Sequence, residues 1–502
     1  MLTASLVLSP GHVVAPVRRR LFGSFVEHMG RCVYTGIYEP GHPTADEDGF
    51  RGDVLALTRE LGVTLVRYPG GNFVSGYRWE DGVGPVADRP VRRELAWHSL
   101  ETNEVGLDEF VRWARKAGAE VMYAVNLGTR GVAEALDVHE YANHEGGTHL
   151  SELRRANGAT QPHGIALWCL GNELDGPWQT GHKTAQEYGR LAAETARALR
   201  QAEPGLELVA CGSSSSTMPT FGAWESTVLE LAYDQVDHIS CHAYYEVIDG
   251  DVDSFLASAV DVDHVVDSVV ATADAVGARL KSTKRIGVSF DEWNVWYQKR
   301  FHADPRTDWE IAPRIIEDRY DVTDAVVVGN LLISLLRHAD RVVAACQAQL
   351  VNVIAPIRSE PGGPAWRQTT FHPFALTSRL ARGRVLRVEI ASPTTRTARF
   401  GDVPVVDAVA THDPDTGEVV LFAVNRGRAE PVEVLVSVTP FGDVEVAEAW
   451  TLHDADASAS NTRDDPDRVV PRPASAEITG GVLRLVAPPV SWSAVRLALR
   501  AS

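Results

Sequence analysis

Short apolar runs alternate with longer stretches of helical spacing through most of the first 375 residues. Eight runs are rich in Val, Ile and Leu, and polar residues or glycine follow each of them: RLFGSFVEH (20–28), TLVRYPGGN (64–72), EVMYAVNLG (120–128), IALWCLGNE (165–173), LELVACGSS (206–214), HISCHAYYE (238–246), RIGVSFDEW (285–293) and VVAACQAQLVN (342–352). Helical spacing lies between them, as at 107–118, 185–205, 255–280 and 323–340. Each run predicts a buried strand, and each spaced stretch predicts a covering helix.

This alternation predicts an α/β protein with parallel strands. Eight strand–helix repeats in the available length fit a closed (β/α)8 TIM barrel better than an open sheet, because such barrels take about 250 residues or more. We therefore expect a barrel domain over 17–378.

After about residue 380 the pattern changes to alternating apolar and polar positions, typical of strands with one buried face. Examples are VVDAVATHD (405–413), GEVVLFAVNRG (417–427), PVEVLVSV (431–438) and VEVAEAWTLH (444–453). They predict an all-β sandwich, jelly-roll-like, over 379–502. Residues 1–16 predict a further strand and turn, which we expect to pair with this tail because chain ends often lie close together. The acidic stretch 459–475 is expected to be a solvated loop.

Composition narrows the classes of partner. The formal net charge of −19 argues against nucleic acid, since a phosphate-binding surface needs an excess of Lys and Arg. No apolar run approaches the about 18 residues of a membrane span, and no basic segment precedes the first apolar stretch, so we expect a cytoplasmic protein without a membrane partner. The five cysteines lack a C-x-x-C pair and are typical of core residues in a reducing compartment: Cys32, Cys169, Cys211, Cys241 and Cys346.

Two of the predicted strands end in acidic residues. The fourth ends in Asn172-Glu173, and the seventh ends in Asp291-Glu292. In an α/β barrel the carboxyl ends of all strands meet at one rim, where active sites lie. Two carboxyl groups there suit glycoside hydrolysis, in which one protonates the leaving oxygen while the other attacks the sugar or activates water. The competing interpretation is that each acid only pairs with a nearby arginine.

Three other motifs do not support a site. The segment HEGGTH (144–149) resembles a zinc motif, but its histidines are five positions apart rather than four. Residues 249–253 begin like a calcium loop, yet Ser254 and Val260 stand where glycine and a bidentate acid are required. The serines after Gly212 lack the second glycine of a nucleophile elbow. We therefore expect no metal and no cofactor.

Several side chains near the strand ends leave alternatives open. Trp178, Trp293 and Trp296 could pack against a sugar or fill the core. The strand-end residues His28 and His242 leave a metal-dependent barrel hydrolase as a second possible function, although the sequence has no His-x-His pair. The third class is a sugar-binding protein without turnover, which would not require two strand-end acids.

Five longer stretches identify a family resemblance: FGSFVEHMGRCVYTGIYEP (22–40), RYPGGNFVSGYRWEDGVGP (67–85), LWCLGNELDGPWQTGHKTAQEYG (167–189), CHAYY (241–245) and SFDEWNVWY (289–297). The chain resembles the α-L-arabinofuranosidases of glycoside hydrolase family 51 almost throughout the barrel. The resemblance implies a retaining, exo-acting enzyme that releases terminal non-reducing α-L-arabinofuranosyl residues from oligo- and polysaccharides. It also implies a homo-oligomer, often a hexamer. An endoglucanase or β-xylosidase of the same clan is the alternative.

By the same resemblance, Glu173 is the general acid/base and Glu292 is the nucleophile. The family's sugar-binding positions fall on Glu27, Asn72, Asn172, Tyr244 and Gln349. Asn172 can donate a hydrogen bond to the sugar 2-OH, an interaction that strengthens in the transition state.

Two further residues could support the nucleophile. Arg67 is expected to pair with Glu292 and keep it ionised, although a purely structural role is equally open. Tyr244 could hydrogen-bond the same carboxyl. The preferred linkage depends on loops such as 296–320, whose shape the sequence does not define.

Overall fold

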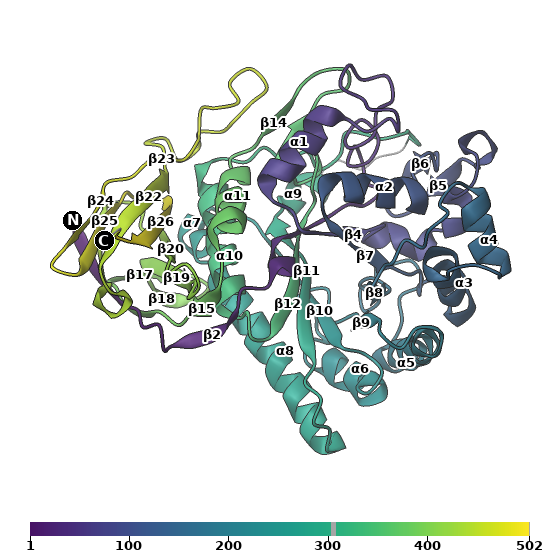
Figure 1. Cartoon of the computed structure of the whole chain (residues 1–502), viewed down its shortest axis with the longest axis horizontal. Coiled ribbons are helices and arrows are strands. Elements are labelled where there is room, and N and C mark those ends of the chain that lie inside the picture. Colours follow the sequence, from purple (N-terminus) through teal and green to yellow (C-terminus); the bar gives the residue numbers. More distant parts are fainter. Residues whose placement is uncertain (303–307, 501–502) are drawn as a thin grey trace.

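The computed structural model describes residues 1–302 and 308–500 and contains a closed barrel of eight parallel strands (Figure 1). Around the barrel the strands follow chain order: β3 (Gly23–Phe25), β4 (Leu65–Tyr68), β7 (Glu120–Ala124), β8 (Leu167–Leu170), β9 (Glu207–Ala210), β10 (His238–Tyr245), β11 (Gly287–Val295) and β12 (Val342–Ala348). The last strand closes on the first, with Cys346 beside Gly23. Each strand overlaps one of the eight predicted runs, so the predicted barrel is confirmed.

Helices cover the outside of the barrel (Figure 1). The α-helices of the described residues are α1 (Gly52–Leu61), α2 (Leu107–Ala117), α3 (Val132–Asn143), α4 (His149–Ala156), α5 (Ala185–Ala202), α6 (Ala223–Ala232), α7 (Val252–Leu256), α8 (Ala259–Leu280), α9 (Gln298–His302), α10 (Val322–Arg337) and α11 (Phe371–Leu380). The prediction of one continuous helix over 255–280 is wrong, because the helical backbone is interrupted between α7 and α8. There the Ser258 hydroxyl donates to the Phe255 carbonyl at 2.7 Å, so a side chain competes with the helical backbone bonds. Within the described ranges, no helix combines the length and apolarity needed to cross a membrane.

Two further sheets form a β-sandwich beside the barrel (Figure 1). The five-stranded sheet has the order β16 (Glu389–Ala391), β1 (Leu2–Val7), β21 (Val432–Ser437), β25 (Val482–Ala487) and β24 (Ala476–Thr479). The seven-stranded sheet has the order β2 (Val13–Pro16), β15 (Arg384–Leu386), β19 (Val406–His412), β20 (Val419–Asn425), β26 (Ser491–Leu499), β22 (Val444–Leu452) and β23 (Arg472–Pro473). A separate apolar core lies between them. The predicted all-β tail is confirmed.

The amino terminus completes both sheets of the sandwich. Strand β1 runs parallel to β21, with Leu2 opposite Val432, and β2 pairs with β15. The expected pairing of residues 1–16 with the tail is therefore confirmed. The exact division into 17–378 and 1–16 plus 379–502 stays a prediction. Short two-stranded pairs complete the strand inventory: β5 (Arg92–Glu94) with β6 (Ser99–Glu101), β13 (Ile357–Ser359) with β14 (Ala365–Arg367), and β17 (Thr394–Thr397) with β18 (Gly401–Pro404).

Helix α10 joins the barrel to the sandwich and is buried along almost its whole length. Its Asn330 amide donates to the Asp407 carboxylate of β19 at 2.8 Å. Gly329 faces Trp492 of β26, and a Cβ at this position would lie 2.2 Å from the indole ring. Only glycine therefore lets the helix backbone approach the sheet this closely.

The acidic loop 459–475 differs in part from the expectation. Its charged residues are exposed, but three others are buried: Ala459, Asn461 and Val469. The Asn461 side chain bonds the backbone of Val469 in both directions, and the Ala459 carbonyl accepts from the Val322 amide at 3.1 Å. The loop is thus anchored on the start of α10 rather than fully solvated.

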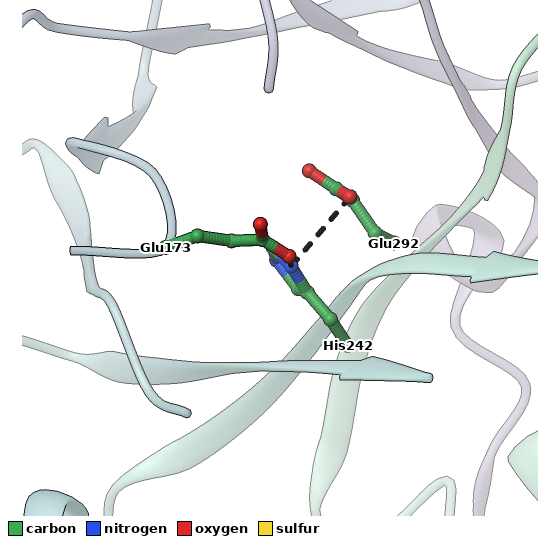
Figure 2. A group of neighbouring side chains, drawn as sticks. All are labelled: Glu173, His242 and Glu292. Carbon is green, nitrogen blue, oxygen red and sulfur yellow. Dashed lines mark hydrogen bonds and ion pairs between the residues drawn. The ribbon is translucent and has the colours of Figure 1, made fainter. Parts of the chain in front are cut away.

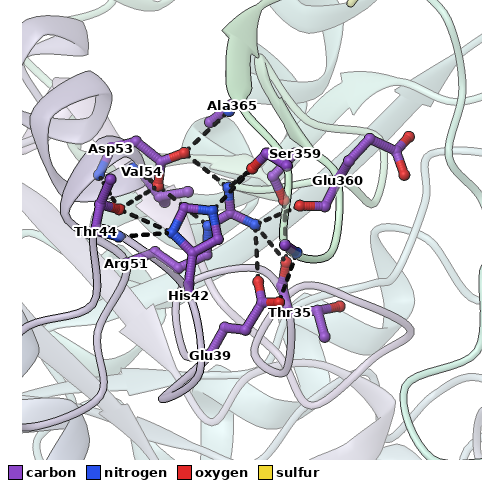
Figure 3. Close-up of polar contacts among 12 residues, drawn as sticks. Thr35, Glu39, His42, Thr44, Arg51, Asp53, Val54, Ser359, Glu360 and Ala365 are labelled. Atoms are coloured by element: carbon purple, nitrogen blue, oxygen red, sulfur yellow. Dashed lines mark hydrogen bonds and ion pairs between the residues drawn. The ribbon is translucent and has the colours of Figure 1, made fainter.

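A buried arginine ties the connection after β3 to the connection after β12 (Figure 3). The Arg51 side chain is 0% exposed and pairs with Glu39 at 2.9 Å and Asp53 at 2.7 Å. It also donates to the carbonyl oxygens of Glu360 at 2.7 Å and Gly363 at 2.6 Å. Strands β3 and β12 are neighbours in the barrel, so this network, the Arg51 clasp, fixes two loops of the same rim against each other.

A second charged group, the amino-end cluster, lies at the opposite end of the barrel. Arg20, just before β3, pairs with Glu120 at the start of β7 (2.5 Å) and with Glu207 at the start of β9 (2.8 Å). Glu207 also lies 3.3 Å from His238 at the start of β10. The cluster therefore links four barrel strands at the face that usually carries stability rather than chemistry.

Candidate active site

All seven predicted site residues lie at the carboxyl-terminal rim of the barrel. Glu27 and Gln349 follow β3 and β12, Asn72 follows β4, Asn172 and Glu173 follow β8, Tyr244 lies in β10 and Glu292 lies in β11. Figure 2 shows Glu173 and Glu292 reaching toward each other from opposite sides, with His242 between and below them.

Glu292 is buried and receives a hydrogen bond on each carboxylate oxygen. Arg67 donates to Oε1 at 2.6 Å, and the Tyr244 hydroxyl donates to Oε2 at 2.7 Å. Burial raises the pKa of Glu292 above its ordinary value, whereas the charges of His242 and Arg67 act to lower it. The expected contact between Arg67 and Glu292 is confirmed. A carboxylate fixed in this way is suited to attack in a defined direction.

Glu173 is more accessible than Glu292, with 11% of its side chain exposed against 6%. The Trp178 indole donates to Oε2 at 3.0 Å, and Nδ1 of His242 lies 2.8 Å from Oε1. The backbone φ of Glu173 is +44°, a left-handed conformation that costs a non-glycine residue about 1–2 kcal/mol. This strained turn directs the side chain toward Glu292 and leaves one edge open to solvent, as an exchangeable proton donor requires.

The two acids lie close enough for direct attack on a sugar. One carboxylate oxygen of Glu173, one of Glu292 and one ring nitrogen of His242 all lie within 4.8 Å of one another. Retaining glycosidases hold their carboxyls about 5–5.5 Å apart, whereas inverting enzymes need about 6.5–9.5 Å to admit a water molecule. The observed spacing therefore favours retention.

Glu27 and Gln349 form a second buried polar group. The Gln349 amide donates to Oε2 of Glu27 at 3.2 Å, while the Trp97 indole and the Phe73 backbone amide both donate to Oε1 at 2.8 Å. Burial raises the pKa of Glu27 to about 8, although the bonds from Phe73 and Trp97 oppose this rise. The group presents fixed polar atoms that can satisfy sugar hydroxyls, which would otherwise be buried without partners.

Asn172 has a defined amide orientation. Its Oδ1 accepts from Arg67 at 2.8 Å, so its NH2 group is turned toward Asn72, whose Oδ1 lies 3.4 Å away. That contact is long, and the amide hydrogens therefore remain suited to a hydroxyl of a bound sugar.

His242 and Asp291 form a contact that was not predicted from the sequence. Nε2 of His242 lies 2.9 Å from Asp291, whose other oxygen lies 3.6 Å from Nε of Arg67. In a regular strand, neighbouring residues such as Asp291 and Glu292 face opposite sides of the sheet. The register of β11 with both neighbouring strands shifts at this point, and both acids contact His242.

The tryptophans divide between core and site. Trp293 is 0% exposed and stacks on Phe374, which makes it a core residue. Trp178 is 53% exposed beside Glu173, and Trp296 packs edge-on against Tyr244 with ring centroids 5.1 Å apart. Trp97, which contacts Glu27, was missed because it lies in a loop between two short strands, where no periodicity marks a buried face.

Among the described residues, the one cluster of acidic, His and Cys donors with spacing for a cation is Glu173, His242 and Glu292. Both ring nitrogens of His242 face carboxylates, as in a doubly protonated imidazole, which has no lone pair for a metal. The segment 249–253 is an acidic turn in which Asp251 caps α7.

Comparison with known proteins gives matching results over the whole chain. Family models described as α-L-arabinofuranosidase 1 domain and α-L-arabinofuranosidase C-terminal domain match residues 57–257 and 291–491. A Streptomyces lividans protein named intracellular exo-α-(1→5)-L-arabinofuranosidase is 60% identical over 99% of this chain and 76% of its own. A Bifidobacterium longum protein named exo-α-(1→6)-L-arabinofuranosidase is 56% identical over 98% of this chain and 97% of its own.

Solved structures agree with this result. A family 51 α-L-arabinofuranosidase from Bifidobacterium longum superposes with a TM-score of 0.95 at 50% identity and 99% coverage of both chains. An α-L-arabinofuranosidase from Thermotoga maritima, solved with arabinose, superposes with a TM-score of 0.88 at 33% identity, over 99% of this chain and 100% of its own. The chain therefore belongs to the α-L-arabinofuranosidases of glycoside hydrolase family 51.

Proposed function

We propose that the protein is a retaining, exo-acting glycoside hydrolase that releases terminal non-reducing α-L-arabinofuranosyl residues from arabinose-containing oligo- and polysaccharides. The observation that carries this proposal is the pair of facing acids, Glu173 and Glu292, with oxygens within 4.8 Å of each other at the barrel rim. The names of relatives at 50–60% identity support the choice of sugar.

The two acids take different roles in the proposed mechanism. Glu292 attacks the anomeric carbon as a carboxylate, because Arg67 and Tyr244 fix both of its oxygens. Glu173 gives its proton to the leaving oxygen and later takes a proton from the water that hydrolyses the glycosyl-enzyme. Asn172 donates to the sugar 2-OH, and the Glu27–Gln349 group binds the remaining hydroxyls.

We propose that the enzyme requires a terminal arabinofuranosyl group whichever glycosidic linkage joins that group to the rest of the substrate. The names of the relatives differ between (1→5) and (1→6) bonds, and hydrolysis of arabinobioses with each linkage would show which one this chain prefers. Part of the loop 296–320 expected to influence it, residues 303–307, lies outside the described residues. Hydrolysis of a panel of aryl arabinofuranosides, xylosides and glucosides separates this proposal from the β-xylosidase and endoglucanase alternatives.

Alanine variants of the two acids test the assignment of roles. Glu173→Ala should still form the glycosyl-enzyme from an aryl arabinofuranoside with a good leaving group, because that step needs little protonation. Azide should rescue it and yield an arabinosyl azide of retained configuration. Glu292→Ala should lose at least about 10⁴-fold in kcat, and any azide product should be inverted.

Glu207→Ala, at the other end of the barrel, is the matched control and should keep full activity. Exchange of the two azide behaviours would reverse the roles of Glu173 and Glu292. Substantial residual activity in both variants, without any response to azide, would exclude this pair as the catalytic machinery.

We also propose an intracellular homo-oligomer, with a hexamer as the assembly that the family resemblance supports. The names of relatives from Streptomyces lividans and Bacillus subtilis include the word intracellular. Light scattering would report a mass six times the 54.6 kDa of one chain, and a monomeric peak at micromolar concentration would contradict the assembly.

A further inference from the structure

His242 occupies a position between the two candidate catalytic acids (Figure 2). Its Nδ1 lies 2.8 Å from Oε1 of Glu173 and 3.6 Å from Oε2 of Glu292. Its Nε2 lies 2.9 Å from Oδ1 of Asp291. The side chain is 2% exposed, so bulk water does not supply partners for either nitrogen. One imidazole is therefore in contact with three carboxyl groups at once.

We propose that His242 is a positioning residue that keeps a positive charge throughout the reaction and pairs with whichever catalytic carboxyl is negative, Glu292 before glycosylation and Glu173 after it. This inference rests on the proposed retaining mechanism. It assigns His242 no part in proton transfer, because the proton given to the leaving group comes from Glu173.

The charge balance of the first step creates the need for such a residue. As the bond from Glu292 to the anomeric carbon forms and the glycosidic bond breaks, the Glu173 proton passes to the leaving oxygen. Glu292 changes from carboxylate to neutral ester, while Glu173 changes from neutral acid to carboxylate. The negative charge thus moves across a gap of less than 4.8 Å, and Nδ1–H of His242 faces both ends of that gap. Deglycosylation reverses the change.

Asp291 is the group that would keep the imidazole charged. A neutral histidine donates through only one nitrogen, and its other nitrogen would then present a lone pair to a carboxylate. Asp291 is 1% exposed and its pKa is lowered, because the charges of Arg67 and His242 outweigh the effect of burial. It therefore remains an acceptor for Nε2–H at the pH of the reaction.

Four acidic groups around the ring favour its cationic form, and one arginine opposes it. Glu173 and Asp175 follow β8, Asp291 and Glu292 lie in β11, and Arg67 in β4 is the opposing positive charge. Burial alone would lower the pKa of His242, but Glu292, Asp291 and Glu173 together raise it well above its ordinary value.

A substitution that removes the charge tests the proposal through the pH profile of kcat/KM. In His242→Gln, Glu292 and Glu173 should both hold their protons to higher pH. The acidic limb, set by ionisation of Glu292, and the basic limb, set by deprotonation of Glu173, should therefore both move upward, by about one pH unit, a tenfold change in each ionisation. A purely structural role would lower kcat without moving the limbs.

His238→Gln is the matched control, since His238 lies at the other end of the same strand and faces Glu207. It should leave both limbs unchanged. Unchanged limbs in a folded His242→Gln variant would overturn the proposal.

A measurement on the unaltered enzyme keeps the proposal testable if the variant fails to fold. In 15N-histidine-labelled protein, both ring nitrogens of His242 should show the shifts of an imidazolium at pH 7. They should keep those shifts after an arabinofuranosyl-configured inactivator esterifies Glu292. A neutral tautomer in either state overturns the inference. Failure of the inactivator to label Glu292 would instead count against the proposed function, so the two failures are distinguishable.

Discussion

The two ends of the barrel carry similar charged groups in very different surroundings. At the amino end, Arg20 pairs with Glu207, which also faces His238 of β10. At the carboxyl end, Arg67 pairs with Glu292, which also faces His242, a second histidine of β10. The Arg20 side chain is 26% exposed and Arg67 is 1% exposed. The principal difference is therefore burial rather than residue type.

This difference reverses the direction of the pKa shift. The bonds from His238 and Arg20 lower the pKa of the half-exposed Glu207 to about 2. Burial raises the pKa of Glu292, although its 2.6 Å bond from Arg67 is shorter than the 2.8 Å bond from Arg20 to Glu207. Water still reaches part of the Arg20–Glu207 pair, with side chains 26% and 39% exposed, whereas the buried Glu292 depends on Arg67, Tyr244 and His242 to stabilise its charge. The pKa of a buried carboxylate therefore depends strongly on the charges and hydrogen bonds of its neighbours, and a catalytic acid needs such control of its ionisation.

After the acids themselves, the largest difference between the two ends of the barrel is expected when Arg67 and Arg20 are each replaced by lysine. Arg67→Lys cannot donate to Glu292 and Asn172 together, so kcat/KM should fall by about 10²–10³. The pKa of Glu292 should rise, which moves the acidic limb of the pH profile to higher pH. Arg20→Lys should leave both quantities unchanged. Steady-state kinetics from pH 4 to 8 would check this, and equal losses in the two variants would remove the distinction between the ends.

A smaller effect is expected from removal of a neutral group at the carboxyl end. Asn172→Ala should lower kcat by about 10–10², because the bond to the sugar 2-OH is stronger in the transition state than in the ground state. KM should change less. A loss confined to KM would show that Asn172 only binds substrate, and the charged groups alone would then account for the chemistry of this end.

The smallest effect is expected at the amino end and concerns stability. The pKa of Glu207 is about 2 in the folded protein and lies near its ordinary value in the unfolded chain, so its ionised form stabilises the fold above about pH 4.5. This contribution should disappear as the pH falls toward 2. Glu207→Gln should lower Tm by about 1–2 °C at pH 7, since half-exposed pairs contribute about 1 kcal/mol or less.

The difference in Tm between Glu207→Gln and the unaltered protein should shrink toward pH 2–3, and kcat at pH 7 should not change. Thermal unfolding at several pH values would measure this. A constant difference in Tm would mean that the ionisation of Glu207 does not contribute to stability.

The pattern of apolar and polar residues along the sequence was enough to predict the barrel strands and the meeting of the two acids. The eight apolar runs predicted the barrel strands, because a strand buried on both faces needs consecutive apolar residues. The barrel topology then placed the ends of strands four and seven at one rim, which predicted that Glu173 and Glu292 would meet. Long motifs such as RYPGGNF (67–73) added Arg67 and Asn72 to that rim.

Tertiary structure decided the features that depend on irregular backbone or on distant contacts. A register shift in β11 brings both Asp291 and Glu292 to His242, whereas neighbouring residues of a regular strand face opposite sides of the sheet. Trp97 reaches Glu27 across 70 residues, and Arg51 reaches Gly363 across 312 residues. Neither contact leaves a periodic signal in the sequence, because each depends on where closure of the barrel places two loops. Closure also determines burial, and burial decides whether an Arg–Glu–His group stabilises the fold or supports the proposed chemistry.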